Sequence, residues 1–397
     1  MVYQDLEGLA LALNTFAVFD KLLEDSVISE LKRLIEFRES DTRGAVRQYT
    51  RFVSALYNAD AEGNFTDYLW QKLRFDDNLY IRSGGRVQAP VSDACEHELD
   101  CLESLSQISS DTIQKRLGYD AFLPSWKTEN RAIKKAYADR AKQVSKLGYG
   151  MYAAHAMFTV KEGALMPVKI ADPIRLSDLK GYETERQTVI DNTRALIEGK
   201  TAANALLYGD AGTGKSSTIK AVSNAFRDEG LRLIEVPKRE MEAIPIIMEA
   251  LSTNPLKFII FIDDLSFAQE GDDMSTLKTI LEGSVAAKTP NIVIYATSNR
   301  RHLVKENFTE RGNDDVHANE TLQEKVSLSG RFGLSIHFGK PNQERYLSIV
   351  KALTERYGID VDEAGLCIEA ERFALERGGR SPRLARQFVE SLMRRQA

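Results

Sequence analysis

Residues 205–217 read ALLYGDAGTGKSS, an apolar run that leads into a glycine-rich turn with the spacing G-x-x-x-x-G-K-S. The pattern after the turn, from Ser217 to Phe226, is helical. A strand, this turn and a helix form a phosphate-binding loop, because glycines let backbone N–H groups surround a phosphate at the positive end of the helix. The stretch predicts a nucleotide site in which Lys215 reaches the β- and γ-phosphates and the Ser216 hydroxyl binds Mg²⁺. The residues expected to contact the nucleotide are Gly209, Asp210, Ala211, Gly212, Thr213, Gly214, Lys215, Ser216 and Ser217.

Short runs rich in Val, Ile and Phe alternate with helical patterns around this loop. The runs are ANALLYG, LRLIEVP, KFIIFIDD, NIVIYATSN and LSIHFG. Five such buried strands, separated by helix-length segments, predict an α/β fold with a five-stranded parallel sheet that helices cover on both faces. Residues 341–397 return to helical periodicity and predict a small helical domain, so we expect the α/β core to span residues 171–340.

The first part of the chain has a different pattern. Helix-period segments predict a mainly helical domain over residues 1–170, with a polar helix from about residue 128 to 146. Two apolar runs, Met151–Val160 and Leu165–Ile170, flank a Lys-Glu-Gly turn and predict a β-hairpin within this domain. We expect residues 1–170 to hold a protein partner or substrate, although no motif in them has a known chemistry.

An acidic pair follows the third of the predicted core strands. KFIIFIDD runs directly from apolar residues into Asp263 and Asp264. Paired aspartates after a strand often act as helix caps or turn formers. Their place on a buried strand after the phosphate-binding loop favours a magnesium role, with Asp263 holding the ion through water and Asp264 polarising the attacking water.

Three further polar residues lie where they could act on a bound triphosphate. Asn299 ends the next strand, in ATSN, and could sense the γ-phosphate or orient water. Arg331, before the last strand, could insert into the site of a neighbouring subunit and stabilise charge in the transition state. Ser381 and Pro382 predict a helix start, which places Arg383 in the first turn, where a cation is disfavoured unless an anion lies nearby.

The order GDAGTGKS, IDD, ATSN, GRFG and SPRLARQF over residues 172–397 resembles the AAA+ ATPases. The resemblance implies a sheet in the order 5-1-4-3-2, a C-terminal helical lid, and ATP with Mg²⁺ as cofactors. It also implies a homo-oligomer, a ring such as a hexamer or a filament, in which an arginine finger acts between subunits. Carried over by motif, Walker A includes Lys215 and Ser216, and Walker B consists of Asp263 and Asp264. Sensor 1, the finger and sensor 2 are Asn299, Arg331 and Arg383.

A second stretch carries the resemblance to the adenine side of the site. The segment LSDLKGYE, residues 176–183, looks like the one that precedes the first helix, with Leu179 and Tyr182 near the base. Together with YGDAGTGKSS, FIDDLSF and IYATSNRRHL, it looks like a bacterial AAA+ family known as a domain of unknown function. The motifs also resemble, more distantly, replication initiators and helicase loaders.

One position departs from the family pattern. Most AAA+ proteins have glutamate after the magnesium aspartate, whereas this chain has Asp264. Because aspartate is one methylene shorter, it would hold water less well, which favours slow turnover. Replication initiators also carry an aspartate pair, so the departure does not exclude hydrolysis.

Composition limits the cellular setting. The chain has 397 residues, net charge -5 and three cysteines, and it lacks an apolar run of about 20 residues. We therefore expect a soluble, cytoplasmic protein with no signal peptide and no membrane partner. The acidic balance gives no general reason to bind nucleic acid, although the final 27 residues hold seven arginines against three glutamates.

Three functions remain open from the sequence. The leading one is a Mg²⁺-dependent ATPase that couples its nucleotide state to oligomerisation and to remodelling of a protein partner. A second is a DNA-associated ATPase of the initiator or helicase-loader type. A third is a slow or non-hydrolysing ATP switch, a hypothesis that the aspartate at position 264 supports.

Overall fold

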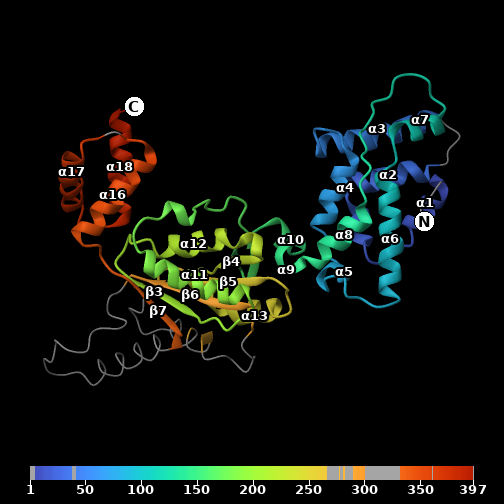
Figure 1. Cartoon of the computed structure of the whole chain (residues 1–397). Coiled ribbons are helices and arrows are strands. Elements are labelled where there is room, and N and C mark those ends of the chain that lie inside the picture. The colour runs from blue at the N-terminus through green and yellow to red at the C-terminus, as the bar shows by residue number, and fades with distance from the viewer. Residues whose placement is uncertain are drawn as a thin grey trace. The chain divides into compact units, whose positions relative to one another are not determined.

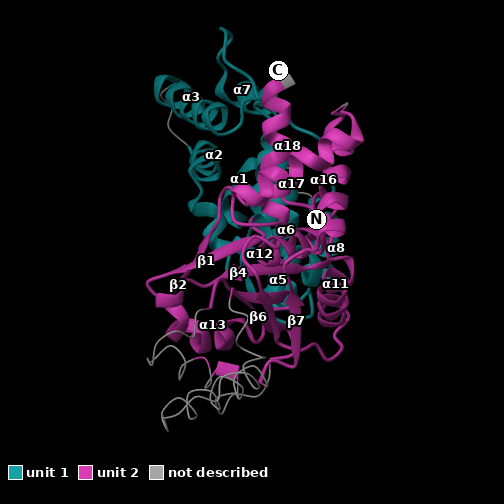
Figure 2. Ribbon diagram, turned by 90° about the vertical axis from the view of Figure 1, so that its left-hand side faces the viewer, with its two compact units in different colours: residues 1–154 teal, residues 155–397 magenta. Residues whose placement is uncertain are grey.

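The computed structural model describes residues 5–37, 42–265, 277, 280–281, 289–299, 331–359 and 361–396. The chain forms two compact units, Met1–Ala154 and His155–Ala397 (Figure 2). The division into three domains with boundaries at residues 170 and 340 stays a prediction. No helix in the described part of the chain is both long and apolar enough to cross a membrane.

The first unit is built from helices around its own hydrophobic core (Figure 1). The helices are α1 (Leu6–Leu13), α2 (Ser26–Glu36), α3 (Thr42–Ala59), α4 (Phe65–Arg74), α5 (Leu79–Arg82), α6 (Val91–Ser106), α7 (Ser110–Leu117), α8 (Ile133–Lys142), α9 (Val144–Leu147) and α10 (Gly150–Ala154), with a 3-10 turn η1 (Asp20–Glu24). Helix α2 illustrates the cause, because its apolar residues recur along one helical face. All of them are buried: Val27, Ile28, Leu31, Leu34 and Ile35.

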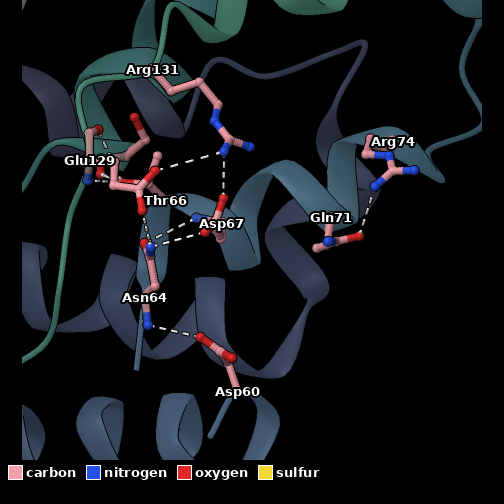
Figure 3. Close-up of polar contacts among 9 residues, drawn as sticks. Asp60, Asn64, Thr66, Asp67, Gln71, Arg74, Glu129 and Arg131 are labelled. Atoms are coloured by element: carbon pink, nitrogen blue, oxygen red, sulfur yellow. Dashed lines mark hydrogen bonds and ion pairs between the residues drawn. The ribbon is translucent and has the colours of Figure 1, made fainter. Parts of the chain in front are cut away.

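The single helix predicted over residues 128–146 is wrong, because its first part runs beside the start of α4 instead (Figure 3). Asn64 Nδ2 donates a hydrogen bond to Glu129 Oε1 at 2.7 Å. The backbone N–H of Glu129 donates to Thr66 Oγ1 at 2.9 Å. These long-range bonds hold residues 127–131 outside any helix, and the helical part is divided into the shorter α8 and α9.

The second unit contains a sheet with seven strands among the described residues. They are β1 (Met157–Lys161), β2 (Ala164–Pro167), β3 (Ala205–Gly209), β4 (Leu231–Glu235), β5 (Lys257–Ile262), β6 (Ile292–Ser298) and β7 (Leu334–Phe338). The strand order is β2-β1-β4-β5-β6-β3-β7, and every pair except β1 with β2 is parallel. The prediction of a five-stranded sheet is therefore wrong in strand number. The five strands predicted for the core, β7, β3, β6, β5 and β4, are consecutive neighbours within it.

The two additional strands are the hairpin that the sequence assigned to the N-terminal domain. Strand β1 pairs in parallel with β4, in the register Met157 with Leu233, so the hairpin extends the sheet. Its turn residues Glu162 and Gly163 both have positive φ, 53° and 75°, as a tight two-residue hairpin turn requires. The apolar residues 151–154 belong to helix α10 instead of the first strand.

Helices complete the second unit. These are α11 (Glu183–Ile197), α12 (Lys215–Ala225), α13 (Ile244–Leu251), α16 (Gln343–Tyr357), α17 (Glu363–Glu376) and α18 (Pro382–Gln396), with 3-10 turns η2 (Leu176–Asp178), η3 (Arg227–Glu229) and η4 (Lys238–Ala243). Helices α11 and α12 pack on the sheet through Val189, Ile219 and Val222. Helices α16, α17 and α18 form a small bundle with its own core, here called the lid (Figure 1).

Gly209 at the end of β3 cannot be replaced without strain. Its φ is 135°, and a Cβ built there would lie 2.2 Å from the carbonyl oxygen of Phe338 on β7. We expect Gly209→Ala to destabilise the second unit by about 2–4 kcal/mol, measured by chemical denaturation, because backbone strain and overlap add. The matched control is Gly199→Ala, where φ is 72° and no atom lies within 4 Å of the added Cβ. It should cost only about 1–2 kcal/mol, and equal losses in the two variants would exclude close packing as the cause.

Candidate nucleotide-binding site

The phosphate-binding loop lies between β3 and α12, where the sequence predicted it. Gly212 and Gly214 have φ of 75° and 94°, values that glycine adopts without penalty. Residues 211–217 line a cavity of about 600 Å³. The side chain of Asp210 lies elsewhere, since its Oδ2 accepts a hydrogen bond from the backbone N–H of Lys340 at 2.8 Å.

Lys215 is the most informative side chain of the loop. It is 5% exposed, and its Nζ donates hydrogen bonds to the carbonyl oxygens of Gly209 and Asp210 at 3.1 and 2.8 Å, and to Asn299 Oδ1 at 2.9 Å. All three acceptors are neutral oxygens, and burial lowers the pKa of this ammonium below its usual range. Burying a cation is costly, and the nearby carboxylates of Asp210, Asp263 and Asp264 offset only part of that cost, so the loop is suited to an anion that bonds Lys215 Nζ directly.

Ser216 and Asp263, the two residues predicted to bind Mg²⁺ through oxygen atoms, lie next to each other. Ser216 Oγ donates to Asp263 Oδ1 at 2.6 Å, across the gap between the start of α12 and the end of β5. Thr297 Oγ1 donates to the same carboxylate oxygen at 2.6 Å, and no role was predicted for it. Hydroxyl and carboxylate oxygens are the donors that Mg²⁺ prefers when phosphates and water complete its shell. The residues present therefore fit a Mg²⁺–triphosphate complex.

Asp264 and Asn299 lie at the exposed edge of the site. Asn299 Nδ2 donates to Asp264 Oδ1 at 2.6 Å, while its Oδ1 accepts from Lys215. The amide thus connects the loop lysine to the second aspartate. A γ-phosphate that engaged Lys215 and Asn299 would compete for both of these contacts.

The segment before α11 also lines the cavity, through both Leu179 and Tyr182, the residues predicted there. Leu179 is half-buried. Tyr182 is 1% exposed, its ring stacks on Phe338 with centroids 5.4 Å apart, and its hydroxyl donates to Gly339 O at 2.5 Å. Burial raises the pKa of Tyr182 to about 12, so its hydroxyl stays protonated. A contact of Tyr182 with a base stays a prediction.

The lid supplies the remaining wall. Ser381 Oγ accepts from the N–H of Leu384 at 3.2 Å, which confirms the predicted start of α18. Arg383 is exposed and lines the cavity, and its backbone N–H donates to Gly212 O at 3.2 Å. The sequence did not identify the other lid residues that line the cavity: Ile349, Leu353, Pro382, Arg386, Gln387 and Glu390.

Arg331, like Gly209 and Asp210, is a predicted site residue that does not line the cavity. It is half-buried immediately before β7 and is absent from the described lining of the cavity. Residues 327–330 of the same motif, and Arg300 and Arg301 after Asn299, lie outside the described residues. The structure thus brings together the predicted loop, the aspartate pair, Asn299 and Arg383, and leaves Arg331 apart from them.

The loop between β3 and α12, the strand-end aspartates and the adjoining helical lid are the features of a P-loop protein of the AAA+ class. The chain belongs to the family described as "Protein of unknown function (DUF815)", which matches residues 152–396.

Two other kinds of protein resemble parts of the chain at low sequence identity. The replication factor C large subunit of Methanococcus maripaludis is 23% identical over 125 residues, 30% of this chain and 26% of that protein. The chain thus matches about a quarter of that relative's length. The RuvB Holliday junction branch migration motor of Thermotoga maritima shares 16% identity at a TM-score of 0.38, over 55% of this chain and 63% of that chain. A single-residue variant of it gives 17% identity and a TM-score of 0.37.

Proposed function

We propose that the protein binds ATP with Mg²⁺ and hydrolyses it. The observation that carries the proposal is the buried Lys215, whose partners are neutral oxygens, next to the Ser216–Asp263 pair of oxygen donors. A triphosphate supplies anionic oxygens that can bond Lys215 Nζ directly, and its Mg²⁺ finds hard oxygen ligands at the adjoining strand end.

Each residue then has a distinct task. The N–H groups of the loop and the Lys215 ammonium hold the phosphates, and Ser216 and Asp263 would hold the Mg²⁺, which neutralises phosphate charge when bound. Asp264 accepts the proton of the attacking water, and Asn299 orients that water or the γ-phosphate. Arg383 adds positive charge from the lid, next to Gly212.

Asp264 fits slow turnover. Its backbone has φ of 53°, the left-handed region, where aspartate is tolerated better than glutamate or most other residues. The backbone conformation therefore favours the shorter acid at this position. Slow hydrolysis suits a protein whose nucleotide state changes its assembly and remodels a partner held by residues 1–170, in the cytoplasm.

The proposed assembly is a homo-oligomer in which Arg331 acts on the nucleotide of a neighbouring subunit. We expect phosphate release per protomer to rise with protein concentration in the wild type. In Arg331→Ala, phosphate release per protomer should not rise with protein concentration. It should also be slower than in the wild type by about 10³-fold or more, because an arginine finger stabilises transition-state charge. The control is Arg395→Ala, which removes an exposed arginine that pairs with Glu369. If turnover per protomer does not depend on protein concentration and Arg331→Ala turns over ATP as the wild type does, Arg331 does not act between subunits.

A further inference from the structure

We propose that Thr297 is a positioning residue that sets both acidic side chains of the site through one hydroxyl group. The inference rests on the proposed function, since it concerns how the Mg²⁺ and water sites are built. Thr297 lies near the end of β6 and is 2% exposed. It also lines the cavity, but its hydroxyl is bonded to Asp263 and to the N–H of Asp264, so its effect passes through these two residues.

The hydroxyl acts as donor and acceptor at once. Thr297 Oγ1 donates to Asp263 Oδ1 at 2.6 Å and accepts the backbone N–H of Asp264 at 2.9 Å. Strands β5 and β6 pair in parallel up to Ile262 with Ala296, so Thr297 lies directly across from Asp263, where the ladder ends. The side-chain hydroxyl thus adds two contacts where the ladder ends and fixes the two aspartates relative to β6.

The bond to Asp263 orients the proposed metal ligand. Asp263 Oδ1 also accepts from Ser216 Oγ at 2.6 Å, but Ser216 is itself expected to bind the ion. Thr297, on strand β6, is therefore the partner of Asp263 that is not itself expected to bind the ion. Partners of this kind orient ligands, and their loss commonly costs metal affinity.

The bond to Asp264 supports a left-handed residue at the turn. Asp264 is one of three non-glycine residues with positive φ in the described part of the chain. Its N–H is held by Thr297, and the N–H of Leu265 donates to the carbonyl oxygen of Thr297 at 2.7 Å. This turn brings Asp264 Oδ1 within 2.6 Å of Asn299 Nδ2, so the hydroxyl of Thr297 also sets where the proposed general base lies.

Two variants separate the hydroxyl from the shape of the side chain. Thr297→Val keeps the volume but can neither donate nor accept, whereas Thr297→Ser keeps the hydroxyl. The readout is the affinity for a fluorescent ATP analogue, measured with and without Mg²⁺ in the full-length protein. We expect Thr297→Val to lose about 10- to 100-fold of the affinity gain that Mg²⁺ provides, with little change when Mg²⁺ is absent. Thr297→Ser should restore most of the gain.

A second buried threonine of the same unit is the matched control. Thr193 is fully buried, and its Oγ1 lies 2.9 Å from the Tyr295 hydroxyl, outside the site. Thr193→Val should leave the Mg²⁺ effect unchanged, and denaturation of each variant shows whether it is folded.

Each outcome has a separate meaning. The proposal is overturned if Thr297→Val keeps the wild-type gain from Mg²⁺, or if Thr297→Ser is as impaired as Thr297→Val. A wild-type protein that binds no ATP analogue at all overturns the proposed function instead. Because the readout is binding, the test also works in a protein that hydrolyses ATP slowly. In an active wild type, Thr297→Val should also lower kcat by about tenfold or more with little change in KM.

Discussion

Lys215→Ala should lose ATP binding by about 10²–10⁴-fold. Hydrogen bonds to charged groups contribute about 1.5–3 kcal/mol each, and two such bonds to phosphate would contribute about 3–6 kcal/mol, or about two to four powers of ten. The same substitution removes the contacts of Nζ with the carbonyl oxygens of Gly209 and Asp210, so the loop also loses support. Isothermal titration with Mg²⁺ and ATP measures the effect.

The control for this substitution lies on the same helix. Lys220 is on α12 but pairs with Glu235 at 3.1 Å, outside the cavity lining. Lys220→Ala should bind ATP as the wild type does. Binding of ATP by Lys215→Ala within about threefold of the wild type would show that the loop is not the phosphate site.

Asp264→Asn should slow phosphate release by about 10²–10⁴-fold while ATP binding stays close to that of the wild type. The amide is nearly isosteric and can still accept from Asn299 Nδ2, but it cannot take a proton from water. Phosphate release at saturating ATP, with binding measured in parallel, separates the two effects.

This result also distinguishes an ATPase from a switch. Unchanged phosphate release in Asp264→Asn would mean that Asp264 is not the base, and would favour a protein that reports bound ATP by conformation. Asp191→Asn serves as the control, since Asp191 is on the exposed surface of α11 and accepts from Gln187 at 2.8 Å. It should match the wild type in both assays.

The features that the sequence predicts correctly are local ones. The loop, its flanking strand and helix, and the start of α18 depend on neighbouring residues, because turn geometry and helix capping are set within a few positions. The acidic pair could also be located, since the ends of parallel strands meet at one edge of a sheet. The cap at Ser381 is a confirmed detail, and Ser216 and Asp263 lie close enough to share a hydrogen bond, while their binding of Mg²⁺ stays a prediction.

Features that depend on distant partners could not be predicted. The hairpin of β1 and β2 joins the sheet because β1 pairs with β4, more than seventy positions further along, as in Met157 with Leu233. The segment 127–131 loses helical structure because it bonds to α4. The sequence did not indicate a role for Thr297, because its contacts with Asp263 and Asp264 form only when β6 pairs with β5.

A structure of the wild-type protein with Mg²⁺ and a non-hydrolysable ATP analogue tests directly whether Lys215, Ser216 and Asp263 hold the nucleotide and its metal. We expect the β- and γ-phosphates to lie within hydrogen-bonding distance of Lys215 Nζ, which no longer contacts Asn299 Oδ1, and the metal to lie next to Ser216 and Asp263. A nucleotide bound elsewhere, or an empty loop at saturating analogue with Lys215 still bonded to Asn299, would contradict this expectation.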